Sequence, residues 1–217
     1  MSYDPELLAA TGFVEPSVLA EFPRLTLRWL TVDGPVGSVS RGVRRRLREL
    51  SNRYRGATVV AMRTQPIPHA YRAFFRQVGL DPDATRIPNE EAAVARLMQG
   101  GFRSQSLLAD ALLIALVETG VPVWALDGEL VDAGGLGIRT SESGEHFGSS
   151  GRTLPAGQLV VSDPRQIHAL LFGAIVPGHE AGPRSRRLAL FAVGVEGVPD
   201  IHVEEALWSC AEVLAPR

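Results

Sequence analysis

The sequence predicts an α+β fold in which helices pack on a mixed, strand-rich C-terminal half. Helical periodicity dominates up to about residue 119, and short strand-like runs separated by Gly, Pro, Ser and Asp follow from Val121. One closing helix ends the pattern, so helices come first and a strand-rich half follows. With 217 residues, 45% of them hydrophobic, the chain is long enough for a sizeable core.

The first 40 residues contain their own Leu-rich pieces, and we expect them to form an extension that packs on a single domain, residues 41–217. The N-terminal run MSYDPELLAATGF is acidic and lacks the basic start and apolar run of a signal peptide. The longest apolar stretches, Leu107–Val117 and Ile167–Pro177, reach about half a membrane span. We therefore expect a soluble, cytoplasmic protein with no membrane association, and no obligate protein partner is indicated.

Basic residues concentrate between Arg41 and Arg76, where ten arginines accompany one acid, Glu49. The first part, RGVRRRLRELSNRYR, reads as a helix. A solvated helix face and a phosphate-binding surface both fit this pattern. All 22 basic residues of the chain are Arg, whose planar guanidinium suits phosphate. The candidate RNA-binding residues are Arg41, Arg44, Arg45, Arg48, Arg72 and Arg76.

The next run, ATVVAMR from Ala57 to Arg63, reads as a strand, and Pro66 and Pro68 then break the chain. The following run, PHAYRAFFRQVG, reads as a helix with Pro68 near its start. Helical spacing turns one set toward the core: Tyr71, Phe74, Phe75 and Val78. The opposite side of this helix is either a solvated face or a second basic surface, and it carries His69, Arg72 and Arg76.

Two helices follow a turn-rich connector. Asn89 is expected to cap the first, which ends at Gly100–Gly101. Ser104 is expected to cap the second, which runs to about Thr119 and is apolar nearly all round. Asp110 lies inside that apolar run, so it either occupies a narrow exposed strip or belongs to a buried polar network or site.

The strand-rich half contains the runs VPVWAL, LGIRT, GQLVVS, IHALLFGAIV and RRLALFAVGV. Asp200 is expected to cap the last helix. The single cysteine, Cys210, cannot form an internal disulfide. It lies on an apolar helical row, which favours burial over a reactive thiol.

Several common catalytic motifs are missing from the sequence. It has no GxxxxGK[ST] phosphate loop, no GxGxxG between a strand and a helix, and no GxSxG nucleophile turn. The histidines at 69, 146, 168, 179 and 202 lack the spacing of metal ligands. We expect no metal and no cofactor, and any chemistry must use scattered polar groups around a pocket.

From about Ala70 to Leu214 the chain resembles the stand-alone form of the B3/B4 domain of the phenylalanyl-tRNA synthetase beta subunit. The order and spacing of several segments carry this resemblance. These are HAYRAFFRQVGLDPDATRIPNEEAAVARLMQGG, SLLADALLIALVETGVPVWALD, GIRTSESGEHF, LPAGQLVVSD, FGAIVPGHEAG and RRLALFAVGVEGV. The match covers about two-thirds of the chain.

In the synthetase, this domain is an editing site that hydrolyses tyrosine wrongly attached to the phenylalanine tRNA. The resemblance therefore implies a B3/B4-like fold, a basic surface that faces tRNA or aminoacyl-tRNA, and an aminoacyl pocket. It implies water attack without a nucleophilic serine or a metal. The expected function is a tRNA- or RNA-binding protein related to tRNA editing, and whether it is also a trans-acting aminoacyl-tRNA deacylase, an ester hydrolase, stays open.

Two departures from the family pattern bear on this expectation. Trp124 stands where the synthetase has a His, and the region around Phe191 is apolar where the synthetase has a Glu. Both family residues are tied to recognition of the wrong amino acid. Their loss favours an alternative, a non-catalytic module that binds RNA or a small amino-acid-like ligand. Trp124 itself fits either a core position or an aromatic pocket wall.

The candidate site combines these features. His179 and Glu180 are the only adjacent acid–base pair in an expected loop, and they are either catalytic residues or a surface turn. We expect a pocket where the central helix meets the strand-rich half, with Trp124 and Asp127 near it. The candidate substrate-binding residues are Asp110, Trp124, Asp127, Glu145, Gly173 and Gly178.

Overall fold

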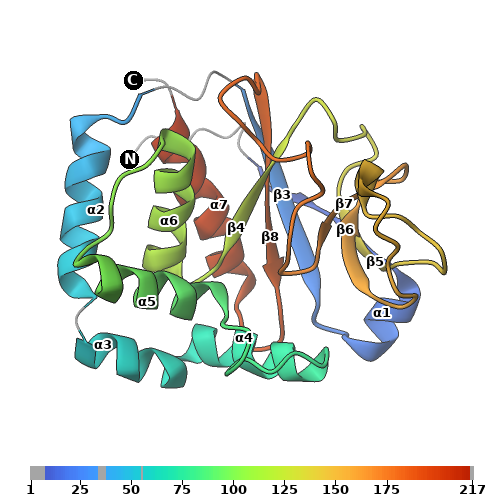
Figure 1. Cartoon of the computed structure of the whole chain (residues 1–217), viewed down its shortest axis with the longest axis horizontal. Helices are drawn as coiled ribbons and strands as arrows, with labels where there is room; N and C mark the ends of the chain where they lie inside the picture. Colours follow the sequence, from blue (N-terminus) through green and yellow to red (C-terminus); the bar gives the residue numbers. More distant parts are fainter. Residues whose placement is uncertain (1–7, 34–37, 55, 216–217) are drawn as a thin grey trace. The chain divides into compact units, whose positions relative to one another are not determined.

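A computed structural model of the chain describes residues 8–33, 38–54 and 56–215, without the side chains of Asp33, Thr58, Val60 and Ser150. Within these residues the fold is α+β, as the sequence predicts, with helices and two β-sheets (Figure 1). The acidic start of the chain, residues 1–7, and Arg55 of the basic run lie outside the described residues. Among the described helices, none has the length and apolar character needed to cross a bilayer.

The helices are α1 (Pro16–Glu21), α2 (Arg41–Arg53), α3 (Gly56–Ala61), α4 (Pro66–Gln77), α5 (Pro88–Gln99), α6 (Leu107–Thr119) and α7 (Asp200–Leu214). Two short 3-10 turns are η1 (Met62–Thr64) and η2 (Gly148–Ser150). The strands are β1 (Ala10–Thr11), β2 (Phe13–Val14), β3 (Thr26–Asp33), β4 (Val123–Asp127), β5 (Gly137–Thr140), β6 (Leu159–Ser162), β7 (Ile167–Leu170) and β8 (Arg187–Gly194).

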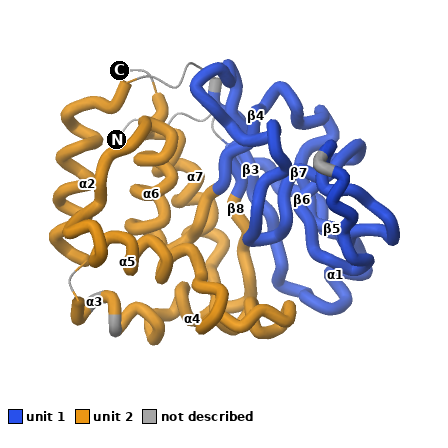
Figure 2. Tube along the Cα trace, viewed as in Figure 1, with its two compact units in different colours: residues 1–36, 124–191 blue, residues 37–123, 192–217 orange. Residues whose placement is uncertain are grey.

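The chain divides into two compact units, each built from two separate stretches of sequence (Figure 2). Unit 1 comprises residues 1–36 and Trp124–Phe191. Unit 2 comprises Gly37–Val123 and Ala192–Arg217. Strand β8 passes from unit 1 into unit 2 between Phe191 and Ala192. The division at residue 40 that the sequence suggests stays a prediction.

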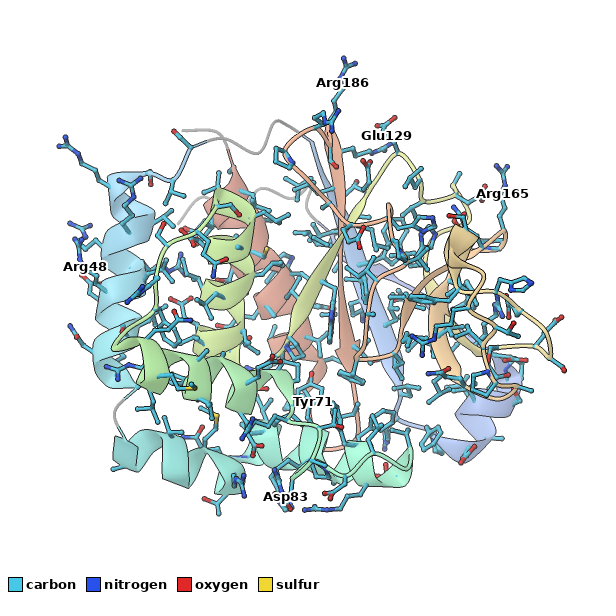
Figure 3. The ribbon with its side chains drawn as sticks, in the orientation of Figure 1. Arg48, Tyr71, Asp83, Glu129, Arg165 and Arg186 are labelled. Atoms are coloured by element: carbon cyan, nitrogen blue, oxygen red, sulfur yellow. The ribbon has the colours of Figure 1, made fainter. Side chains whose placement is uncertain are left out.

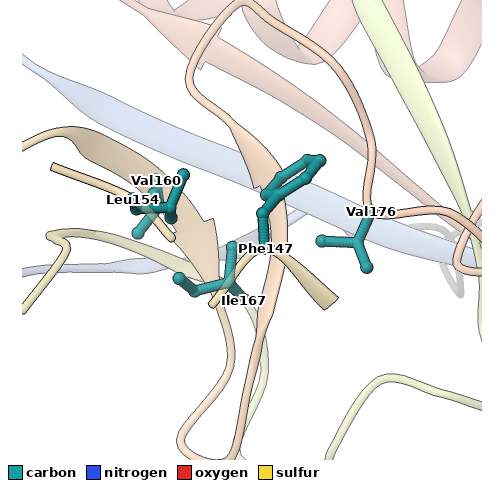
Figure 4. Packing of buried hydrophobic residues seen from close by; sticks show 5 residues of the cluster. All are labelled: Phe147, Leu154, Val160, Ile167 and Val176. Carbon is teal, nitrogen blue, oxygen red and sulfur yellow. The ribbon is translucent and has the colours of Figure 1, made fainter. Parts of the chain in front are cut away.

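Unit 1 holds most of the β-structure. One sheet has the order β1-β3-β8-β4 and the other β2-β5-β6-β7. Strands β5, β6 and β7 pair antiparallel, whereas β2 runs parallel to β5. The parallel contact is close, because a Cβ on Gly137 would meet the ring of Phe13 at 2.3 Å. A small apolar cluster lies beside the β6–β7 hairpin, formed by Phe147, Leu154, Val160, Ile167 and Val176 (Figure 4).

Unit 2 is helical and centres on α6, which packs against α7, α2 and α5. Helix α6 is the central, apolar helix that the sequence predicts, since its residues Ala111, Ile114 and Ala115 are completely buried. Three of the four predicted core residues of α4 are buried, namely Tyr71, Phe74 and Phe75, and Val78 is partly exposed. The Tyr71 hydroxyl donates a hydrogen bond to the carbonyl of Val193 at 2.8 Å. Cys210 is buried on α7, as predicted.

The predicted strand over Ala57–Arg63 is wrong, because the structure has α3 and η1 there. β-Propensity is a weak preference that packing overrides. Helix α3 packs against α5, and this contact between helices favours the helical conformation of the segment over a strand.

Three predicted helix caps are also displaced. Helix α5 begins at Pro88, and the Asn89 side chain instead donates to the carbonyl of Gly120, the residue that caps the C-terminal end of α6 (2.8 Å). Ser106 rather than Ser104 caps α6, by accepting from the backbone N–H of Ala109. Asp200 is the first residue of α7, after Pro199 at the cap position. Gly100 ends α5 with φ of 74°, as predicted.

Candidate functional site

The turn between β6 and β7 buries the carboxylate of Asp163. Its Oδ1 accepts hydrogen bonds from the backbone N–H groups of Arg165 (2.7 Å) and Gln166 (2.8 Å), which close the turn. Its Oδ2 accepts from the backbone N–H of Asp132 (2.9 Å) and pairs with Nε2 of His168 (2.8 Å). Burial raises the pKa of Asp163, but these hydrogen bonds to the charged form outweigh it and hold that pKa below its usual value.

His168 connects this carboxylate to a second histidine. The His168 ring is completely buried in β7, and its Nδ1 lies 3.0 Å from Nδ1 of His179. The backbone fixes this approach, because Val176 N–H donates to the His168 carbonyl and His179 N–H donates to the Val176 carbonyl. The result is a continuous chain of side chains, Asp163–His168–His179, within unit 1.

His179 is the end of this chain and is only partly buried. Burial lowers the pKa of its imidazole, and so does the electrostatic effect that His168 would exert if both rings were protonated, while Glu180 and Asp163 raise that pKa. The net shift is downward, so the ring is mostly neutral at pH 7. Among the described residues, none forms a hydrogen bond with Nε2 of His179. A neutral imidazole with one unoccupied nitrogen can accept a proton from a bound water.

Glu180, the predicted partner of His179, is used differently. Its Oε2 accepts from the backbone N–H of Gly178 at 2.7 Å, which closes a turn at the surface. Gly178 has φ of 89°, which glycine adopts readily. His179 and Glu180 therefore do not act as a pair. Glu180 closes the turn with Gly178, whereas His179 is hydrogen-bonded to His168.

Asp127 lies beside this turn at the end of β4. Its backbone N–H donates to the carbonyl of His179 at 2.9 Å, and Leu126 forms an antiparallel bridge with Glu180. The Asp127 side chain accepts from the hydroxyl of Ser185 at 2.8 Å and from the N–H of Glu129 at 3.1 Å. Asp127 thus fixes the loop that carries His179.

Trp124, on the same strand, sits in an aromatic cluster of unit 1. Its ring stacks on Phe191 with centroids 5.5 Å apart and an angle of 13°, and it contacts Phe172 edge-on. Phe172 has φ of 54°, which is rare for a bulky residue and indicates local strain. Gly173 follows it, where a Cβ would lie 2.8 Å from that of Leu170. Trp124 remains half-buried, so it is packed on one side and accessible on another.

Two further predicted substrate-binding residues have structural partners. Glu145 forms a two-pronged ion pair with Arg139, with N–O distances of 2.9 and 2.5 Å, and this lowers its pKa. Asp110 is 1% exposed and accepts from the Ser104 hydroxyl (2.6 Å) and the Gln105 N–H (2.9 Å). The polar-network alternative for Asp110 is thereby confirmed. Asp110 belongs to unit 2 and the other candidates to unit 1, so the predicted pocket at their junction stays a prediction.

The arginines of α2 divide into exposed and paired groups. Arg41, Arg44 and Arg48 are exposed at helical spacing, and Figure 3 shows the Arg48 side chain extending away from α2. Arg45 lies 3.9 Å from Glu49 on the same surface. Arg46 instead binds Glu118 of α6 through two hydrogen bonds of 2.8 and 2.6 Å. The predicted basic face therefore exists on α2.

The second predicted basic surface, on α4, is only partly present. Arg76 and His69 are exposed, but Arg72 is 5% exposed and cannot contact RNA. Its guanidinium binds both carboxylate oxygens of Glu90 (2.8 and 2.9 Å) and Oδ1 of Asp83 (2.7 Å). A buried arginine needs such partners, and they come from residues that follow α4 in the chain.

A pocket of about 370 Å³ lies on unit 2, between α4 and the turn that follows β8. Its lining is mostly apolar, with three polar side chains, those of His69, Gln77 and Glu196. The sequence did not predict this pocket. No group of three or more His, Cys, Asp and Glu side chains in the described part of the chain is arranged to hold a metal ion.

Sequence reasoning missed Asp163, His168 and Ser185. One signal was available for His168, because a histidine inside an apolar strand run must find a buried polar partner. Asp163, five residues earlier across a turn, was a natural candidate. Ser185 gave no comparable signal.

No model of a known protein family matches the chain, and no curated protein is significantly similar to it. The resemblance to the B3/B4 domain therefore stays a prediction.

Proposed function

We propose that this protein binds tRNA or another RNA and hydrolyses the ester of a mischarged aminoacyl-tRNA, with His179 as the general base. The proposed relationship is to the synthetase editing domain, and the proposed compartment is the cytoplasm. The observation that carries the proposal is the partly exposed His179 imidazole, whose pKa is lowered and whose Nδ1 is held by His168.

The proposed reaction needs no cofactor. Nε2 of His179 takes a proton from a water molecule while the water oxygen bonds to the ester carbonyl carbon. The bond from that carbon to the ribose oxygen then breaks, and the proton on Nε2 passes to the leaving ribose hydroxyl. The products are a free amino acid and a tRNA with an intact terminal hydroxyl. A positioned base of this kind contributes about 10²–10⁴-fold to a rate.

The RNA-binding part of the proposal is supported by Arg41, Arg44 and Arg48, which are exposed on one helix. Phosphate contacts by such arginines release counterions, so affinity falls with salt by about 0.7–0.9 log unit per log unit for each contact. The double variant Arg44→Ala/Arg48→Ala should weaken tRNA binding and flatten that dependence. Arg184→Ala/Arg186→Ala removes the same charge from another exposed segment and should change the slope little.

The decisive experiment measures deacylation of a panel of aminoacylated tRNAs by the purified protein. We expect acceleration for at least one mischarged tRNA, and loss of that acceleration in His179→Gln. His146→Gln, which changes an exposed histidine of the same unit, is the matched control and should retain full activity. Equal rates for the wild type and His179→Gln would overturn the assignment of the base.

A non-catalytic module that binds RNA or a small amino-acid-like ligand is the second candidate. Two carboxylates favour this alternative, because Glu180 already accepts from the N–H of Gly178 and Glu145 is already paired with Arg139. Under this alternative, tRNA binds with the salt dependence described above but no member of the panel is deacylated faster than in buffer.

A further inference from the structure

We propose that Asp163 and His168 are positioning residues that hold His179 in one tautomer, protonated on Nδ1, so that Nε2 is its basic nitrogen. This inference deepens the proposed hydrolysis and rests on it for its catalytic meaning. The geometry alone supports the tautomer, because each hydrogen bond in the chain constrains the next one.

The constraint begins at Asp163, which is 2% exposed. Three backbone N–H groups donate to its two oxygens, and a carboxylate that receives so many donors is stabilised in its charged form. A charged carboxylate can only accept hydrogen bonds. Nε2 of His168, at 2.8 Å from Oδ2, must therefore carry a proton and donate it.

The second link follows from the chemistry of imidazole. A neutral imidazole protonated on one nitrogen has a lone pair on the other. In the proposed arrangement His168 is neutral, so its Nδ1 is the acceptor and the atom 3.0 Å away, Nδ1 of His179, is the donor. This leaves the lone pair of His179 on Nε2. A carboxylate that orients a catalytic imidazole in this way is known to affect rates through the tautomer, without itself taking the proton.

The neighbourhood of the chain is consistent with this order. The carboxylate of Asp127 accepts from Ser185 and from the N–H of Glu129, and that of Glu180 accepts from the N–H of Gly178, so both carboxylates have partners other than Nδ1 of His179. His168 is completely buried between Asp163 and His179, and both of its ring nitrogens are engaged.

The first test needs no substrate. Nitrogen-15 NMR of protein labelled at its histidines distinguishes protonated from unprotonated ring nitrogens, and the His179→Gln variant identifies the His179 signals. We expect His179 to be protonated on Nδ1 and bare on Nε2 at pH 7.5, and His168 to be protonated on Nε2 alone. A bare Nδ1 on His179, or a doubly protonated His168, would overturn the inference.

The second test uses the deacylation assay. His168→Leu removes both hydrogen bonds and should lower kcat about tenfold or more with little change in KM. His168→Gln can donate its amide to Asp163 and accept from His179, so it should recover part of the rate and keep the Nδ1-protonated signal. An unchanged kcat in His168→Leu would refute the positioning role.

The two tests separate this inference from the proposed function. The expected tautomer without any deacylation would overturn the proposed hydrolysis and leave the tautomer assignment standing. Deacylation that depends on His179 but occurs with the opposite tautomer would support the hydrolysis and overturn the role of His168 and Asp163.

Discussion

Two buried charged groups, Arg72 in unit 2 and Asp163 in unit 1, obtain their partners in different ways. Arg72 is surrounded by opposite charges, since it binds Glu90 and Asp83, and Arg63 binds both of these acids as well. Asp163 accepts from three backbone N–H groups, and its last contact leads outward through His168 to His179. The first group forms a closed ion cluster, whereas the second ends at an imidazole with an unoccupied nitrogen. This difference separates a structural use of buried charge from one that is available for chemistry.

The closed cluster predicts the largest effect. Arg72→Ala leaves the buried Glu90 without its main partner and should reduce the free energy of unfolding by about 3–5 kcal/mol. Urea denaturation followed by circular dichroism measures this loss. Arg72→Ala/Glu90→Ala, which removes both charges, should lose less than Arg72→Ala alone. If the double variant is the less stable one, the pairing does not account for the burial of Arg72.

Asp163→Asn tests the open chain and should cost about 2–3 kcal/mol, because an amide nitrogen would face backbone donors where a charged oxygen now accepts. The lowered pKa of Asp163 gives this loss a pH dependence. The carboxylate stabilises the fold at pH values above the ordinary pKa of an aspartate, and this contribution disappears as pH falls through the lowered value. The difference between wild type and variant should therefore shrink in acid, and a constant difference from pH 7 down to pH 2 would contradict the prediction.

His179, at the solvent-facing end of the Asp163–His168–His179 series, predicts a pH profile. The neutral form of His179 is the proposed base, and its pKa is lowered from 6.5, chiefly by burial, against the opposing effect of Glu180 and Asp163. The rate of deacylation should be nearly constant from pH 7 to 8 and fall tenfold per pH unit well below that pKa. Measurement of kcat/KM against pH locates the midpoint. A midpoint above 6.5 would show that His179 is not the titrating base.

The smallest effect is expected where charge is exposed. Arg45 and Glu49 are both solvated on α2, so Glu49→Gln should change the free energy of unfolding by less than about 0.5 kcal/mol. The same change removes the one acid from this basic face and should strengthen tRNA binding at low salt. A loss of stability as large as that of Asp163→Asn would mean that solvent exposure does not explain the difference between Glu49 and Asp163.

Local patterns in the sequence were enough to predict the α+β class, the apolar character of α6 and the buried faces of α4 and α7. The spacing of Tyr71, Phe74 and Phe75 fixed the buried face of α4, and the charge pattern of Arg41, Arg44 and Arg48 fixed an exposed face of α2. These predictions succeeded because the residues on the buried side of a helix recur every three to four positions in the sequence.

The errors arose where the partner of a residue lies elsewhere in the chain. Arg72 resembles a surface residue by spacing, and only Glu90 on another helix makes its burial possible. Asn89 has the chemistry of a cap, yet the carbonyl of Gly120 recruits its amide. The candidate site illustrates the same limit: His179 was predicted from its neighbour Glu180, whereas its actual hydrogen-bond partner is His168, eleven residues earlier.

The division of the chain into units has a consequence for its synthesis. Each unit combines an early and a late stretch of sequence, and the chain crosses between them near residues 36, 123 and 191. Helix α6 in unit 2 obtains its main neighbour, α7, only after Asp200–Leu214 has been made. The sheet that contains β1 and β3 is complete only after β8, and the sheet that contains β2 only after β7. During synthesis, unit 1 therefore lacks part of its residues until Phe191 has been made, and unit 2 lacks α7 until Leu214 has been made, so the apolar faces of both early stretches must be protected until these later residues emerge.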